Sequence, residues 1–109
     1  MALTYKVLGQ SAPSATTNTD VYTVPSATEA VLSSISVCNR SGVAVTYRVA
    51  IRPDGAAIAN EHYLAYDVTV NAADTTIMTI GVTLNAADVV TVYASTANLS
   101  FNIFGSEIS

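Results

Sequence analysis

The sequence predicts an all-β protein, an antiparallel β-sandwich of about seven to eight strands. Apolar and polar residues alternate with the period of a strand along much of the chain, and helical periodicity is weak. Turn residues interrupt these runs every eight to fourteen residues. In addition, Val68–Asp74 (VTVNAAD) returns fourteen residues later as Val82–Asp88 (VTLNAAD). Asn and Asp bond local backbone groups, so each copy predicts a strand that ends in a turn, and together they predict a β-meander. The pattern leaves immunoglobulin-like and jelly-roll-like topologies both open.

The N-terminal third has less regular patterning than the rest. Leu3–Leu8 can pair as an edge strand, and Gln10–Asn18, rich in Ser, Ala and Thr, predicts an exposed loop. Val21–Val24 is short, and Pro25 lacks a backbone donor, which favours an edge strand or a strand end. We therefore expect this part of the chain to lie at the margins of the sheets.

The central strands show the clearest alternation. Gly42–Pro53 places one set of residues on a core face and another on an outer face, because successive side chains point to opposite sides. The core set is Val43, Val45, Tyr47, Val49 and Ile51, and the outer set is Ala44, Thr46, Arg48, Ala50 and Arg52. The preceding strand, Ala30–Asn39, has Val31, Ile35 and Val37 on its core face, with Ser34 and Ser36 opposite. Asn39–Gly42 joins the two strands as a predicted short hairpin.

Further strands are predicted downstream. His62–Val70 alternates with its apolar residues on one side, and Thr75–Ile80 follows before Gly81, which predicts a break or a bulge. Val89–Ala94 and Asn98–Phe104 are the last two strands. The residues expected to point inward are Leu64, Tyr66, Val68, Val70, Met78, Ile80, Leu99, Phe101 and Ile103.

The composition indicates one domain with an unusually uncharged surface. The 109 residues are enough for a single domain, 1–109, within which residues 1–20 leave open an extended N-terminal arm. Only 11% of the residues are charged, against roughly 25% in an average soluble domain. Interface cores are depleted in charge, so this composition favours an assembled protein. The alternative is that Thr and Ser on the outer strand faces are polar enough by themselves.

Charge and sequence pattern argue against nucleic acid and membrane partners. The net charge is −4, and the basic residues are too few to follow a phosphate backbone. These residues are Lys6, Arg40, Arg48 and Arg52. No apolar run approaches the length of a membrane helix, and no secretory signal is evident, so we expect the protein to fold where it is made. The single cysteine, Cys38, fits a reducing compartment and is predicted to be a small buried hydrophobic residue.

No catalytic, cofactor or metal site is predicted. His62 is the only histidine, and Glu61 beside it would point to the opposite face of a strand, so the pair does not converge. Asp67, Asp74 and Asp88 lie in different segments, whereas a calcium loop places several oxygen ligands within one loop. Asp74 and Asp88 are therefore interpreted as structural turn residues. No nucleophile elbow is present.

Tyrosine is the one residue type that favours a ligand. A sandwich could display Tyr22, Tyr63 or Tyr93 for stacking on sugars, although the chain has no tryptophan. The alternative is that these tyrosines belong to the core or to an interface, because most of them fall at alternating positions.

Seven stretches together resemble a known family. They are Tyr22–Pro25, Ile35–Gly42, Val45–Val49, Asn71–Asp74, Gly81–Leu84, Asp88–Ala94 and Leu99–Gly105. From Val21 onward the chain resembles the small β-sandwich virion structural proteins of tailed bacteriophages, of the capsid decoration and neck or tail accessory type. The matching motifs are turns and core positions, so the resemblance supplies a fold and no catalytic, cofactor or metal residue.

The resemblance implies a non-enzymatic structural component of a bacteriophage virion, assembled in the host cytoplasm. Such a protein would self-associate, as a trimer by analogy, and dock on capsid, neck or tail proteins. The expected contact elements are the loop Gln10–Asn18, the N-terminal strand and the loop Asp54–Glu61. The alternative is a carbohydrate- or receptor-binding adhesin module on the virion surface, with host glycans as its partner.

Overall fold

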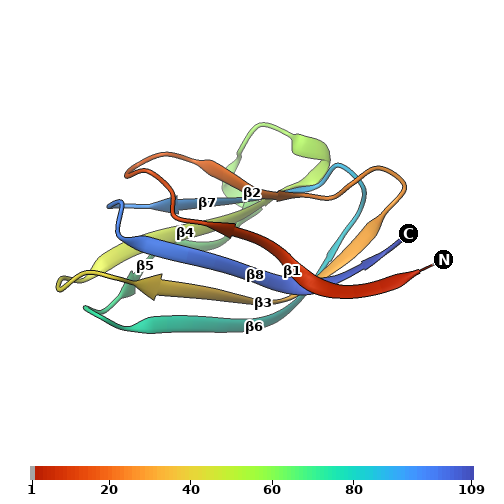
Figure 1. Ribbon diagram of the computed structural model, residues 1–109. Helices are drawn as coiled ribbons and strands as arrows, with labels where there is room; N and C mark the ends of the chain where they lie inside the picture. The colour runs from red at the N-terminus through yellow and green to blue at the C-terminus, as the bar shows by residue number, and fades with distance from the viewer. Residues whose placement is uncertain (1) are drawn as a thin grey trace.

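The computed structural model describes residues 2–109 as two four-stranded antiparallel sheets packed face to face (Figure 1). Its strands are β1 (Leu3–Ser11), β2 (Thr19–Thr23), β3 (Glu29–Asn39), β4 (Val45–Arg52), β5 (Tyr63–Val70), β6 (Thr75–Leu84), β7 (Val89–Ala94) and β8 (Leu99–Ile108). Two short 3-10 turns, η1 (Pro53–Gly55) and η2 (Asn60–His62), lie between β4 and β5. The predicted all-β sandwich is confirmed.

The strand order is that of a jelly roll. Sheet I has the order β1-β8-β3-β6, and sheet II has the order β2-β7-β4-β5. The pairs β1–β8, β2–β7, β3–β6 and β4–β5 are those of one long hairpin rolled up into two sheets. The predicted meander is wrong, because only the β4–β5 connection joins neighbours within one sheet, and every other connection crosses between the sheets.

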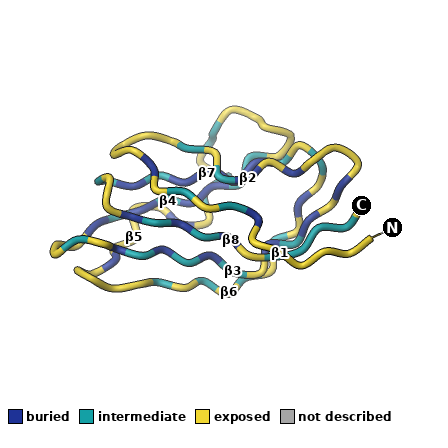
Figure 2. The backbone as a smooth tube through the Cα atoms, in the orientation of Figure 1, coloured by how far each residue is buried: buried dark blue, intermediate teal, exposed yellow. Residues whose placement is uncertain are grey.

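The core lies between the two sheets and is almost entirely apolar. Tyr47 and Phe101 meet edge to face across it, with ring centroids 6.2 Å apart, and the Tyr47 hydroxyl donates to the Met78 sulfur. Both rings are fully buried, and Figure 2 shows the buried stretches along the middle of the strands. Three predicted core residues in β8 (Leu99, Phe101 and Ile103) and three in β4 (Val45, Tyr47 and Val49) are confirmed.

The predicted hairpin at Asn39–Gly42 is wrong, because β3 and β4 belong to different sheets. This segment is an arch that carries the chain from sheet I to sheet II. Asn39 is buried inside it, with 2% of its surface exposed. Its side-chain amide donates to the carbonyls of Val43, Val70 and Asn71, and its carbonyl accepts from Ser41. A polar residue at the end of an alternating strand thus fixes the crossing.

Bulges shift two strands away from their predicted faces. In β3 the register shifts between Leu32 and Ser34, so Ala30 and Leu32 are buried and Val31 is only half-buried. In β5, Asp67 has a left-handed backbone (φ 52°) at a register shift. The predicted inward set of β5 is therefore wrong for Leu64, Tyr66 and Val68, which are exposed, whereas Ala65 and Val70 are buried.

Several other predictions agree with the structure. β1 and β2 are edge strands, and the register of β6 slips by one residue across Ile80–Gly81, as a bulge at Gly81 requires. Gln10 and Ser11 belong to β1, so the exposed loop begins at Ala12, and only Pro13 within it is buried. The two ends lie together, because Ala2 and Ser109 exchange backbone hydrogen bonds (Figure 1).

Candidate functional site

Of the nine large hydrophobic residues that are exposed within residues 2–109, five lie on the outer face of sheet I. Opposed residues on antiparallel strands point the same way, and the register places Tyr5 beside Ser106, and Val7 and Ser34 on either side of Phe104. Large apolar side chains on this face are open to solvent: Leu3 54%, Tyr5 80%, Val7 46%, Ile77 67% and Phe104 37% exposed. We call this surface the sheet I outer face.

The sheet I outer face is also almost free of charge. Lys6 and Glu107, on its strands, point toward the other sheet, because Lys6 Nζ lies 3.1 Å from Glu107 Oε1 and the Tyr22 hydroxyl of β2 donates to Glu107 Oε2. Among the charged residues of its four strands, all within residues 2–109, only Glu29 at the start of β3 lies on the outer side, opposite Ile108 at one corner. An exposed apolar surface of this extent is typical of a contact site.

The size of the face suits an interface. Four strands about 4.8 Å apart and roughly ten residues long cover on the order of 600 Å². Contact with a partner of equal extent would bury about 1,200 Å², the lower limit of a standard stable interface.

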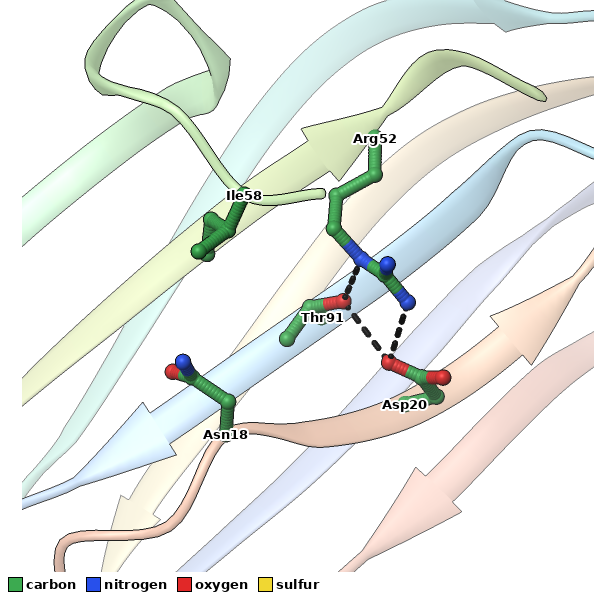
Figure 3. Close-up of a pocket in the computed structure, with 5 residues that line it drawn as sticks. All are labelled: Asn18, Asp20, Arg52, Ile58 and Thr91. Atoms are coloured by element: carbon green, nitrogen blue, oxygen red, sulfur yellow. Dashed lines mark hydrogen bonds and ion pairs between the residues drawn. The ribbon is translucent and has the colours of Figure 1, made fainter. Parts of the chain in front are cut away.

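The outer face of sheet II carries polar and charged side chains beside the exposed ring of Tyr66, and is covered in part by the segment between β4 and β5. Arg52 connects this segment to β2 through hydrogen bonds. Its Nη1 donates to the carbonyls of Gly55 and Ala56, and its Nη2 donates to Asp20 Oδ1 at 2.9 Å. The covering explains why Ala50, predicted to face outward, is buried. A pocket of about 240 Å³ opens beside this ion pair (Figure 3). It is lined by Asn18, Asp20, Arg52, Ile58 and Thr91.

The hydrogen bonds at this pocket indicate a structural role. Arg52 Nε donates to Thr91 Oγ1 at 3.0 Å, and that hydroxyl donates to Asp20 Oδ1 at 2.9 Å (Figure 3). Every nitrogen of the Arg52 guanidinium is used within the chain, and its charge is paired with Asp20. The pocket therefore lies beside a hydrogen-bond network, formed by Arg52, Asp20 and Thr91, that stabilises the position of the β4–β5 segment on the sheet.

A second cluster on sheet II centres on Arg48. Its guanidinium carbon lies 4.1 Å from the ring centroid of Tyr66 and 4.3 Å from that of Tyr93, within the range of cation–π contacts. Arg48 Nε also donates to Asp67 at 2.7 Å, and Tyr63 meets Tyr66 edge to face with centroids 4.8 Å apart. Arg48 thus occupies one face of each ring, although Tyr66 remains 56% exposed.

The residues considered for catalysis and metal binding are not brought together. His62 lies in η2, where its Nδ1 accepts from the Ala59 amide. Asp74 and Asp88 close equivalent turns, accepting from the amides of Thr75 and of Asn85 and Asp54 respectively, while Asp67 pairs with Arg48. Within residues 2–109 no group of three His, Cys, Asp or Glu side chains is placed to hold a metal ion. The helical turns described there include none long and apolar enough to cross a membrane.

The remaining candidate residues are scattered. Cys38 is half-buried on the outer side of β3, opposite Thr75 and Ser100, so the prediction of a buried hydrophobic residue is wrong. Tyr22 is buried between the sheets, where burial and then Glu107 raise the pKa of its hydroxyl. Tyr63 and Tyr93 are half-buried in the Arg48 cluster.

The sheet I outer face was not predicted from the sequence. The sequence pattern that corresponds to this face is the alternation of Leu3, Tyr5 and Val7 with Thr4 and Lys6. This alternation would ordinarily place the apolar residues inside, but their exposure and the contacts of Glu107 with Lys6 and Tyr22 show that the faces are reversed. Comparison with protein-family models, with curated protein sequences and with solved structures found no match to this chain.

Proposed function

We propose that the protein is a non-enzymatic structural component of a bacteriophage virion that self-associates and docks on capsid, neck or tail proteins. The observation that carries the proposal is the sheet I outer face, where five large apolar side chains are exposed and Glu29, at a corner, is the only charged side chain among the described residues. A surface of this kind gains free energy when a partner covers it and meets little charge desolvation cost. A catalytic site would instead need convergent polar groups.

The fold and the resemblance support the same proposal at a coarser level. Jelly rolls occur in viral capsid proteins and also in lectins, so the topology agrees with a shell or tail component by analogy. The resemblance to tailed-phage virion proteins rests on turn and core motifs of this sandwich. Localisation in the virion and docking on other virion proteins belong to the proposal.

Sedimentation of particles tests the docking. Particles from cultures that produce the protein would be banded on a density gradient, and the protein would be quantified by mass spectrometry against the major capsid protein. We expect a fixed ratio across the particle band. Tyr5→Lys, which places a charge on the sheet I outer face, should remove the protein from the band. Thr69→Lys, on the exposed outer side of sheet II, is the matched control and should leave the ratio unchanged. Wild-type protein that stays with the soluble fraction would contradict the proposal.

The second candidate is a carbohydrate- or receptor-binding module on the virion surface, favoured by the Arg48 cluster. Tyr66 offers an exposed aromatic ring beside the carboxylate of Asp67, a combination suited to stacking and hydroxyl recognition of a sugar. A glycan array probes this function directly. Binding that Tyr66→Ala abolishes and Tyr5→Lys preserves would favour the module, and an array without signal would exclude it for the glycans tested.

A further inference from the structure

The outer edge of β6 is a free strand edge without the usual protection. β6 is the last strand of sheet I and pairs only with β3, so its other side meets no strand in the described chain, residues 2–109. Its ten residues, TTIMTIGVTL, contain neither a proline nor a charged residue. Natural proteins usually protect such edges with charged residues, proline or bulges, because unpaired backbone N–H and C=O groups can hydrogen-bond to a strand of another chain.

Each of the other three edge strands contains a charged residue, which β6 lacks, although β6 shares an irregularity with them at Ile80–Gly81. β1 contains Lys6 and a register shift between Val7 and Gly9. β2 has five residues, includes Asp20 and is followed after one residue by Pro25. β5 is bent at Asp67, whose positive φ coincides with a register shift. Charge, proline and bulges are the devices that discourage strand addition.

We propose that β6 pairs antiparallel with β6 of a second copy, joining two sheets I into one continuous eight-stranded sheet. A two-fold contact sets each strand antiparallel to its own copy, so a charge near the axis lies close to the same charge of the second copy. Asp20 in β2 and Asp67 in β5 lie near the middle of their strands, so such a contact would bring like charges close together. β6 brings none, and a second copy of this chain is therefore the partner that its edge fits.

The apolar pattern of β6 also fixes the register of the contact. Ile77 is the centre of Thr75–Thr79, the regular half of the strand before the irregularity at Ile80–Gly81. A two-fold axis at Ile77 sets Ile77 against Ile77 of the second copy, and Thr75 against Thr79. Ile77 is 67% exposed in the single chain, so the pairing buries an apolar side chain, and Thr–Thr neighbours are favourable cross-strand pairs.

This contact would enlarge the surface used for docking. The two-fold axis runs perpendicular to the joined sheet, so both sheet I outer faces lie on the same side. The dimer thus presents twice the uncharged apolar area. The inference specifies the self-association in the proposed function, but it requires no virion: pairing through β6 is measured on the purified protein, and docking is measured on particles. Each can therefore fail without the other.

Cysteine cross-linking tests the contact and its register. In a Cys38→Ser background, Ile77→Cys places two thiols on opposed residues, whose Cα atoms would be about 4.5–5.5 Å apart, within the range of a disulfide. We expect mild oxidation to convert most of this variant into a covalent dimer. Thr83→Cys is the matched control on the same strand and face. In this register its two copies lie about 12 residues apart along the strands, about 40 Å, and should not cross-link.

Lysine substitutions separate edge pairing from face packing. Ile77→Lys should weaken dimerisation at least tenfold in sedimentation velocity, because two lysines would meet at the axis. Tyr5→Lys lies on the same outer face but on β1, at the opposite edge of the sheet, and should dimerise like the wild type. Equal, slow cross-linking of the Ile77→Cys and Thr83→Cys variants, or a dimer lost in Tyr5→Lys and kept in Ile77→Lys, would overturn the proposal.

Discussion

Asn39 shows how one side chain can determine a change of sheet. Its amide and carbonyl satisfy backbone groups of the β3–β4 arch and of the neighbouring β5–β6 connection. We expect Asn39→Ala to lower the free energy of unfolding by about 3 kcal/mol, because it removes the hydrogen bonds of a buried amide, among them the buried one to the Val70 carbonyl. Asn98→Ala, in an exposed turn, is the matched control and should cost less than about 1 kcal/mol. Urea titration measures both, and equal losses would contradict the role assigned to Asn39.

Glu107 predicts a dependence of stability on pH. The hydrogen bond from Tyr22, and then the contact with Lys6, hold the pKa of Glu107 below its ordinary 4.5. A carboxyl group with a lowered pKa in the folded state stabilises fully above its unfolded pKa, and this contribution disappears as the pH falls through the folded value. Wild type should therefore exceed Glu107→Gln in unfolding free energy at pH 7, and the difference should shrink below pH 4.5.

The control for this pH series is Glu61→Gln, in the exposed segment between β4 and β5, which should match the wild type throughout. Tyr22 adds an alkaline arm: burial and Glu107 raise its pKa above the ordinary 10.0, so its contribution is present below pH 10 and is lost as the pH rises through the folded value. A difference between wild type and Glu107→Gln that stays constant from pH 7 to pH 3 would contradict the ionic contact.

At the scale of elements, two glycines of sheet I behave in opposite ways. A Cβ added at Gly105 in β8 would clash with the Val31 carbonyl oxygen, whereas one added at Gly81 in β6 meets no atom within 4 Å. We expect Gly105→Ala to destabilise the protein by about 2 kcal/mol or more, since backbone must move to admit the methyl group. Gly81→Ala should be nearly neutral. Thermal unfolding of both variants checks this, and a tolerated Gly105→Ala would show that β3 and β8 can separate at this bulge.

The elements also show where sequence patterns suffice and where they fail. Alternation located β4 and β8 and most of their core residues, but Val43, predicted to lie in the core, precedes β4 and is 61% exposed. Alternation failed in β3 and β5, where one extra residue reverses the faces. No residue type marks these bulges in the sequence, because residues with a positive φ are found both in a bulge, as Asp67, and in a turn, as Ala73. The crossing at Asn39–Gly42 could not be distinguished from a hairpin in the sequence. The hydrogen bonds that stabilise the crossing run from the Asn39 amide to the carbonyls of Val70 and Asn71, which are distant in sequence.

For the candidate site, the low charge of the sequence predicted an assembled protein, but the surface that would make the contact could not be located from the sequence. The N-terminal strand was expected to make contacts, and Leu3 and Tyr5 do stand exposed on it. The segment Asp54–Glu61 was also expected to make contacts. It is bonded to sheet II through Arg52, and its contact role stays a prediction. Which side of a strand faces solvent depends on pairing with distant strands, and in β1 that pairing is with β8.

At the scale of the whole molecule, the separation of polar and apolar surface is the feature that most needs a function. The charged residues of sheet II form ion pairs with one another, Arg48 with Asp67 and Arg52 with Asp20. Sheet I presents an uncharged face and an unprotected edge on the same side of the molecule. A trimer, as the resemblance implies, would need a different contact from a two-fold pairing of β6, so the number of copies distinguishes the two.

The solution mass of the purified protein, measured by light scattering after size exclusion over a range of concentrations, tests self-association most directly. We predict twice the mass of one chain for the wild type and for Tyr5→Lys, and the mass of one chain for Ile77→Lys. A trimeric mass would retain self-association but contradict the two-fold contact. A wild type that stays at the mass of one chain at every concentration would contradict self-association itself.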